Sequence, residues 1–115
     1  SFWEALNNQA LVLFEMGNTA EAIRRWRSVL EIKRNAEPML ALAAALNNQS
    51  SGDEESIDLA RQALADDPNY VLPGHQENQL WGQKLRQATG VLLSEPRLKG
   101  AVERAEANAD PKSAE

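Results

Sequence analysis

Apolar residues recur along the first part of the chain with the spacing of amphipathic helices separated by polar turns. In the segment 2–16, Leu6, Ala10, Leu13 and Phe14 follow the spacing i, i+4, i+7, i+8, which places them on one face of an α-helix. Gly17 and Asn18 follow, and because both tolerate positive φ, we expect the first helix to end at this pair. A second amphipathic helix is predicted over residues 20–33, with the apolar face Ala22, Ile23, Trp26, Val29 and Leu30.

Four further helices are predicted from the same spacing and from the residues that begin or end a helix. A proline is tolerated in the first turn, so Pro38 is expected there in the third helix, which runs to about Gln49. The fifth helix contains Gly82 and Gly90, and each glycine destabilises a helix by about 1 kcal/mol relative to alanine. The fourth, fifth and sixth helices are predicted at residues 54–65, 75–93 and 95–107, with Trp81, Leu85, Ala88 and Leu92 as the buried stripe of the fifth.

The pattern of the first two helices returns 34 residues later. A fixed period of this length is typical of stacked helical repeats, in which each repeat contacts only its neighbours. The recurring residues are Leu6, Ala10, Glu21, Ile23, Arg27, Leu30 and Asn35, which return as Leu40, Ala44, Glu55, Ile57, Arg61, Leu64 and Asn69.

Residues 2–70 resemble the tetratricopeptide repeat family. That family places a large, a small and another large apolar residue on the first helix, alanine and an aromatic residue on the second, and a proline at the end. The first copy supplies Leu6, Ala10, Leu13, Gly17, Ala22, Trp26, Val29 and Leu30, and the second supplies Leu40, Ala44, Ser56, Ala60, Ala63, Leu64 and Pro68. Four positions depart from the pattern: Arg34 replaces the usual proline, Asn47 an aromatic residue, Ala60 the tryptophan and Ser51 the turn glycine.

The resemblance implies an all-α fold of about six antiparallel helices in three stacked pairs, forming a short right-handed solenoid. The repeats are expected at residues 3–36 and 37–70, with a divergent capping pair over residues 71–107 that completes a domain spanning residues 1–107. Residues 108–115 have little to bury, and we expect a disordered tail there.

Proteins of this family use the first helix of each pair to line a concave groove that binds a peptide or helix of a partner protein. Neither the first nor the third helix carries lysine or arginine, so the groove is predicted to be neutral and partly apolar, without a basic clamp for a carboxyl terminus. Asn8 matches a family position whose amide binds the main chain of the ligand. The predicted groove residues are Asn7, Asn8, Leu11, Phe14, Glu15, Ala45, Asn48 and Gln49. The alternative for its apolar members is packing against upstream repeats or the termini of the chain, and the sequence does not decide between the two.

No arrangement of residues indicates catalysis or a cofactor. His75 is the one histidine, it has no second histidine, cysteine or suitably spaced carboxylate, and an ordinary structural role is favoured for it. We therefore predict a non-catalytic protein-interaction module without cofactor or metal. A structural or oligomerisation segment of a larger scaffold, without a ligand of its own, is the alternative.

Charge and composition restrict the partner. The 115 residues carry a net charge of −5, which argues against nucleic acid and anionic membranes as partners. They include no cysteine, which leaves the compartment undecided, with a soluble, cytoplasmic location slightly favoured. Arginines around Trp26 could form a face for RNA, but the tryptophan falls on the apolar stripe, so a core role is favoured. No segment is long and apolar enough to insert in a membrane. Phe2 and Trp3 would drive self-association if left uncovered.

Overall fold

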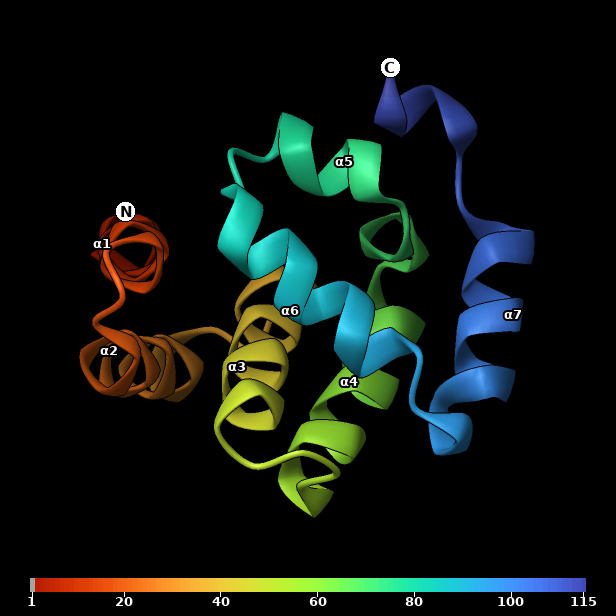
Figure 1. The fold of residues 1–115 in the computed structure, drawn as a ribbon. Helices are drawn as coiled ribbons and strands as arrows, with labels where there is room; N and C mark the ends of the chain where they lie inside the picture. The colour runs from red at the N-terminus through yellow and green to blue at the C-terminus, as the bar shows by residue number, and fades with distance from the viewer. Residues whose placement is uncertain (1) are drawn as a thin grey trace.

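The computed structural model describes residues 2–115, which contain seven α-helices, three short 3₁₀ helices and no strand (Figure 1). The all-α class predicted from the sequence is confirmed, whereas the expected count of six helices is wrong. The α-helices are α1 (Phe2–Glu15), α2 (Thr19–Ile32), α3 (Ala36–Gln49), α4 (Glu54–Asp66), α5 (Pro73–Asn78), α6 (Gln83–Leu93) and α7 (Lys99–Asn108). The 3₁₀ helices are η1 (Pro68–Val71), η2 (Pro96–Leu98) and η3 (Pro111–Ala114).

The first four helices form two hairpins, α1 with α2 and α3 with α4. α1 ends in a Schellman turn: Gly17 has a φ of 86°, its N–H donates to Phe14 O at 3.0 Å, and Asn18 N–H donates to Leu13 O at 2.9 Å. Gly52 also has a positive φ, 78°, in the turn before α4, where its N–H donates to Asn47 Oδ1 at 2.9 Å. The turn after α1 is the one that Gly17 and Asn18 predict, and α1, α2 and α4 begin and end within about one residue of their predicted limits.

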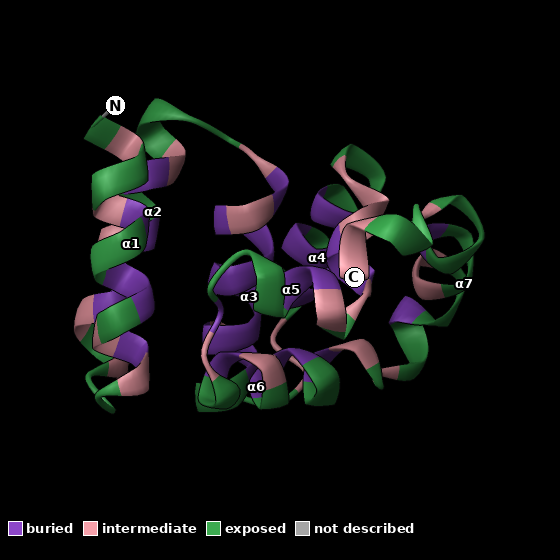
Figure 2. Cartoon of the chain, turned by 90° about the horizontal axis from the view of Figure 1, so that it is seen from above, coloured by how far each residue is buried: buried purple, intermediate pink, exposed green. Residues whose placement is uncertain are grey.

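α3 lies at the centre of the molecule, packed against α2, α4 and α6. Figure 2 shows buried residues along α3, whereas α1 and α2 carry exposed residues on their outer sides. Alanines make this close packing possible, because a helix rich in small side chains lets its neighbours approach from several directions. Trp26 is fully buried between the hairpins, and its Nε1–H donates to Asn7 Oδ1 at 3.1 Å. The predicted core role of Trp26 is confirmed.

The predicted fifth helix over residues 75–93 is in fact two helices, α5 and α6, separated at residues 79–82. Leu80 adopts a φ of 68° and is 83% exposed, so the chain reverses there. Trp81 turns inward and is 2% exposed, while its Nε1–H donates to Glu37 at 3.0 Å. The predicted buried stripe of Trp81, Leu85, Ala88 and Leu92 is confirmed: Trp81 lies in the interruption just before α6, and the other three lie in α6.

The C-terminal tail, residues 109–115, also differs from its prediction. The sequence predicts disorder from residue 108, but Asn108 is the last residue of α7, and Pro111–Ala114 form η3 against α5 (Figure 1). Asn78 Nδ2 donates to Ser113 O and Asn69 Oδ1 accepts from the N–H of Asp110, so two side chains hold the main chain of the tail, which is why a segment with few apolar side chains is ordered.

Candidate partner-binding cleft

The chain fills much of the predicted groove with its own helix α6, which packs across α3 and against α1. Phe14 and Leu11 are 4% and 7% exposed, and Ala45 is fully buried. The ring of Phe14 lies 6.0 Å from that of Trp26. Asn7 is 3% exposed and accepts the tryptophan N–H, so its amide is used inside the fold. These four residues belong to the core.

Glu15 binds the chain itself rather than an open groove. Its two carboxylate oxygens accept from the backbone N–H groups of Lys84 and Leu85, each at 3.0 Å. These are unpaired donors of the first turn of α6, and a carboxylate there also interacts favourably with the helix dipole. Gly82 precedes this turn, and a Cβ atom on it would lie 2.2 Å from Glu15 Cδ. Glu15 therefore fixes where α6 begins, a role that only a contact distant in sequence reveals.

The other three predicted groove residues, Asn8, Asn48 and Gln49, are exposed. The structure does not bring them together. Asn8 lies in a separate shallow hollow on the outer side of α1, and Asn48 lines a cleft on the opposite side of that helix. Gln49 ends α3 and lines neither.

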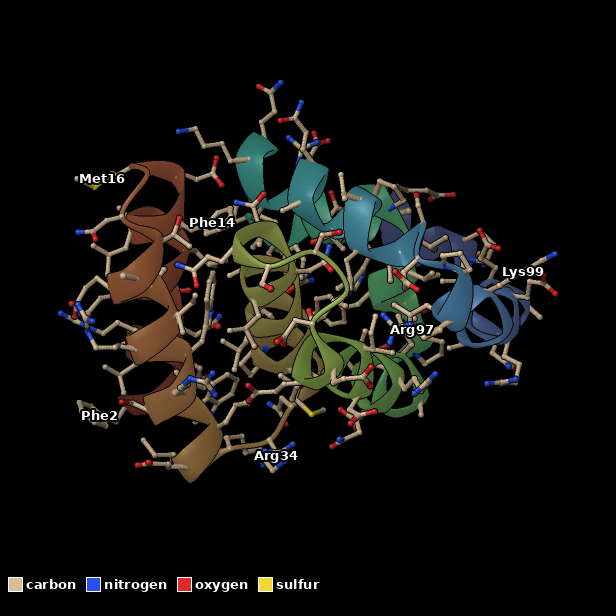
Figure 3. The ribbon with its side chains drawn as sticks, turned by 60° about the horizontal axis from the view of Figure 1, so that its bottom comes forward. Phe2, Phe14, Met16, Arg34, Arg97 and Lys99 are labelled. Atoms are coloured by element: carbon tan, nitrogen blue, oxygen red, sulfur yellow. The ribbon has the colours of Figure 1, made fainter. Side chains whose placement is uncertain are left out.

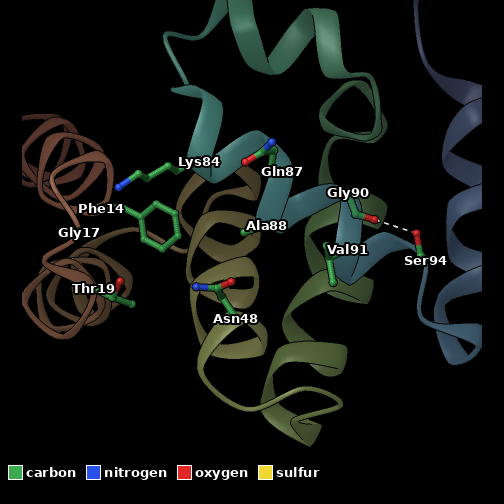
Figure 4. Close-up of a pocket in the computed structure, with 10 residues that line it drawn as sticks. All are labelled: Phe14, Gly17, Thr19, Asn48, Lys84, Gln87, Ala88, Gly90, Val91 and Ser94. Atoms are coloured by element: carbon green, nitrogen blue, oxygen red, sulfur yellow. Dashed lines mark hydrogen bonds between the residues drawn. The ribbon is translucent and has the colours of Figure 1, made fainter.

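Asn48 of α3 lines a cleft together with residues of α6 and residues at the end of α1. We call it the α1–α6 cleft; its volume is about 750 Å³. Figure 4 shows Lys84 extending from α6 toward α1, above the ring of Phe14, with Asn48 of α3 lower in the same space. The lining residues are Phe14, Gly17, Thr19, Asn48, Lys84, Gln87, Ala88, Gly90, Val91 and Ser94.

The lining of the α1–α6 cleft combines apolar contact with amide groups and one cation. Phe14 offers the edge of a ring fixed by the core, and Val91 offers an aliphatic side chain that is 65% exposed. The amides of Asn48 and Gln87 can each donate and accept hydrogen bonds. Lys84 is the one charged lining residue, so the cleft has a positive rim on an acidic protein. This mixture suits a peptide, whose main chain needs donors and acceptors and whose side chains need apolar contact.

Gly90 stands out in this lining. It lies inside α6, where glycine is about 1 kcal/mol less favourable than alanine. Its φ is ordinary, and a Cβ atom there would meet no atom of the protein within 4 Å. Gly82 and Gly74, by contrast, would each place a Cβ within 3 Å of another residue. The fold therefore explains the other two glycines but not Gly90. The sequence shows its helical position, but only the structure shows the open space beside it.

The arginines of α2 are engaged in ion pairs. Glu21 pairs with the arginines three and four positions later, and the hydrogen bond from the first of them lowers the pKa of its carboxyl group. Arg27 makes two hydrogen bonds to Glu55 of α4, at 2.8 and 3.0 Å, and these lower the pKa of Glu55. Because Trp26 is fully buried, no base can stack on it, which removes the aromatic part of an RNA-binding face.

His75 lies outside the α1–α6 cleft, at the start of α5, and is 8% exposed. Its Nδ1 lies 3.3 Å from Ser113 O of the tail, and Tyr70 packs edge-on against its ring at 4.6 Å. Within residues 2–115, no cluster of three acidic, histidine or cysteine side chains could hold a metal ion. None of the helices over the same residues has the length and apolar character needed to cross a membrane.

No family model, curated protein or solved structure matches this chain.

Proposed function

We propose that this chain is a non-catalytic protein-interaction module of the tetratricopeptide type, and that it binds a short segment of a partner protein in the α1–α6 cleft. The two hairpins support the repeat assignment, since α3 begins at Ala36, one 34-residue period after Phe2, the start of α1. In this proposal α6 occupies one part of the concave face and narrows the remainder to a cleft of peptide dimensions.

The observation that carries the proposal is Gly90. A glycine in an exposed helix lowers stability, and neither a positive φ nor a close contact within the chain requires it here. A site where another backbone must approach closely is the remaining physical reason for a missing side chain. The amides of Asn48 and Gln87 lie in the same lining and can bond to that backbone.

Lys84 favours a partner segment that carries a carboxylate next to an apolar residue. The ammonium group lies near the ring of Phe14, so one ligand residue can make the ion pair while its neighbour packs on the ring. An exposed ion pair contributes less than about 1 kcal/mol, so Lys84 would select among ligands more than it would hold them.

The test is selection of peptides from a random display library on the full chain, followed by affinity measurement with two matched variants. Gly90→Gln places a side chain in the α1–α6 cleft, and Gly100→Gln is its control in α7, outside the cleft. We expect the selected peptides to lose at least about tenfold in affinity, or about 1.4 kcal/mol, for Gly90→Gln and to bind the control normally. Peptides that bind both variants alike, or no enrichment at all, would contradict the proposal.

The alternative of a structural, self-associating segment has an observation of its own. Phe2, Val12 and Met16 are 70%, 60% and 73% exposed on the outer side of α1 (Figure 3). Trp3, which the sequence paired with Phe2, is only partly exposed and lines a hollow together with Tyr70 and residues at the end of α4. Light scattering on the full chain and on Val12→Glu distinguishes the two: a dimer that becomes monomeric on substitution supports self-association, and a monomer in both opposes it.

A further inference from the structure

The tail crosses a small surface formed by η1 and α5 at the end of the molecule opposite η2 (Figure 1). Four residues of this surface contact the tail: Asn69, Gly74, His75 and Asn78. We call these four residues the tail site. The tail residues themselves remain largely on the surface, and none of residues 109–115 is fully buried.

The tail site binds main-chain atoms of the tail. Asn78 Nδ2 donates to Ser113 O at 3.0 Å and to Glu115 O at 2.8 Å. Asn69 Oδ1 accepts from the N–H of Asp110 at 2.8 Å. No tail side chain takes part in these bonds, so the site recognises the path of a backbone and makes little demand on sequence.

His75 adds a second side-chain donor to the same carbonyl region. Ser113 O can only accept, so the His75 Nδ1 that lies 3.3 Å away carries the proton. Nε2 is then the acceptor nitrogen, and it is buried without a partner. The ring is thus fixed in one tautomer by the tail and by the edge-on contact with Tyr70.

Gly74 gives the site its one steric requirement. A Cβ atom on Gly74 would lie 2.6 Å from Ala114 O and 2.8 Å from Ala114 Cβ. α5 and the tail therefore approach each other as closely as van der Waals contact allows, and only a small residue fits at the position of Ala114. The recognised ligand is a short 3₁₀ turn with a small residue near its end.

We propose that the tail site is a peptide-binding site, occupied here by residues 110–115 of the same chain, and that it accepts the same segment of a second copy when its own tail is displaced. The contacts are a few hydrogen bonds at the surface, and segments held in this way open at a small fraction of the global unfolding free energy. A tail attached to its own site has an effective concentration of about 1 mM, so exchange between copies requires that the cis contact be weakened.

Two complementary variants of the full chain test this. Ala114→Trp carries a tail too large to lie against Gly74, so its tail site is vacant. Gly74→Val blocks the tail site but leaves a tail of the natural sequence free. Both substitutions lie at the surface contact with the tail, and the other helices keep their core residues. Circular dichroism and melting temperature check that each variant folds.

We expect each variant alone to be monomeric by light scattering, and their equimolar mixture to form heterodimers at about 0.5 mM, below the effective concentration of the cis tail. Amide exchange at Ser113, whose N–H donates to Asp110 O at 2.9 Å, should quicken at least about tenfold in each variant alone. In the mixture it should slow again for the Gly74→Val tail, which then occupies the vacant tail site of Ala114→Trp. A mixture that stays monomeric, or tails that are equally protected in Gly74→Val and the natural chain, would overturn the proposal.

Discussion

The two halves of the molecule are held together differently. In α1–α4, apolar residues with helical spacing meet in a continuous core around Trp26 and α3. The helices α6 and α7 add Leu85, Leu92 and Ala105 to the same core, and polar contacts with the first half fix the positions of α5–α7 as well. Glu15 accepts hydrogen bonds at the start of α6, Glu37 accepts from Trp81, and Arg97 donates to Gly52 O at 3.0 Å.

This difference indicates that the second half is arranged on a first half that is already formed. The carboxylates of Glu15 and Glu37 can bind the second half only when α1 and α3 are in place. Damage to the core of α1–α4 should therefore destabilise the whole molecule, whereas loss of one polar contact should loosen α5–α7 and leave the hairpins intact. The following predictions test that comparison.

Trp26→Ala is expected to have the largest effect, a loss of about 3–5 kcal/mol in the free energy of unfolding. The indole is fully buried, and its removal leaves both a cavity and an unpaired Asn7 Oδ1. Urea unfolding followed by circular dichroism measures the change. Trp3→Ala is the control: because Trp3 is only partly buried, this variant should lose clearly less free energy of unfolding. A loss below about 1 kcal/mol for Trp26→Ala would contradict the central place of this residue.

Gly82→Ala should destabilise by about 1–3 kcal/mol, since the new Cβ overlaps Glu15, at 2.2 Å from its Cδ. Gly90→Ala is the matched control in the same helix. Because no atom lies within 4 Å of the new Cβ, Gly90→Ala should raise the free energy of unfolding by about 0.5–1 kcal/mol through helix propensity. Thermal unfolding of the two variants gives changes of opposite sign. A gain for Gly82→Ala would mean that α6 does not need the close approach to Glu15.

The same contrast explains what the sequence could and could not predict. Hydrophobic spacing and the turn glycine Gly17 are local signals, and they determine α1–α4. Gly82 and Leu80 carry no local signal strong enough to divide a continuous apolar stripe, because the reason for the break is Glu15, almost seventy positions earlier. For the candidate site, the repeat pattern predicts Phe14 and Asn48 as members, but their surroundings depend on α6, which lies outside the repeat.

Glu15→Gln should cost about 0.5–2 kcal/mol, because an amide replaces one of its two acceptor oxygens with a donor and removes the charge beside the start of α6. Hydrogen exchange distinguishes a local from a global effect. We expect amide exchange at Leu85 to quicken by more than the loss of global stability requires. Amide exchange in α3 should quicken only by the amount that this loss requires. Glu31→Gln, an exposed change near the end of α2, is the control. Equal acceleration throughout the chain would show that the halves unfold as one.

The smallest effect is expected from the ion pair of Arg27 and Glu55, which joins the two hairpins across the surface. Its side chains are 47% and 49% exposed, so the pair contributes less than about 1 kcal/mol. The hydrogen bond from Arg27 lowers the pKa of Glu55 in the folded chain. Its contribution is therefore present above the unfolded value of about 4.3 and is lost as the pH falls through the lower folded value.

Comparing the stability of the natural chain with that of Glu55→Gln from pH 7 to pH 3 measures this contribution. The difference should be largest at pH 7, shrink as the folded carboxyl group is protonated, and fall further in high salt because exposed charges are screened. A difference that persists unchanged at pH 3 would mean that Glu55 acts through packing. In that case the contact between the hairpins would resemble the apolar packing of the first half more than the polar contacts that position the second half.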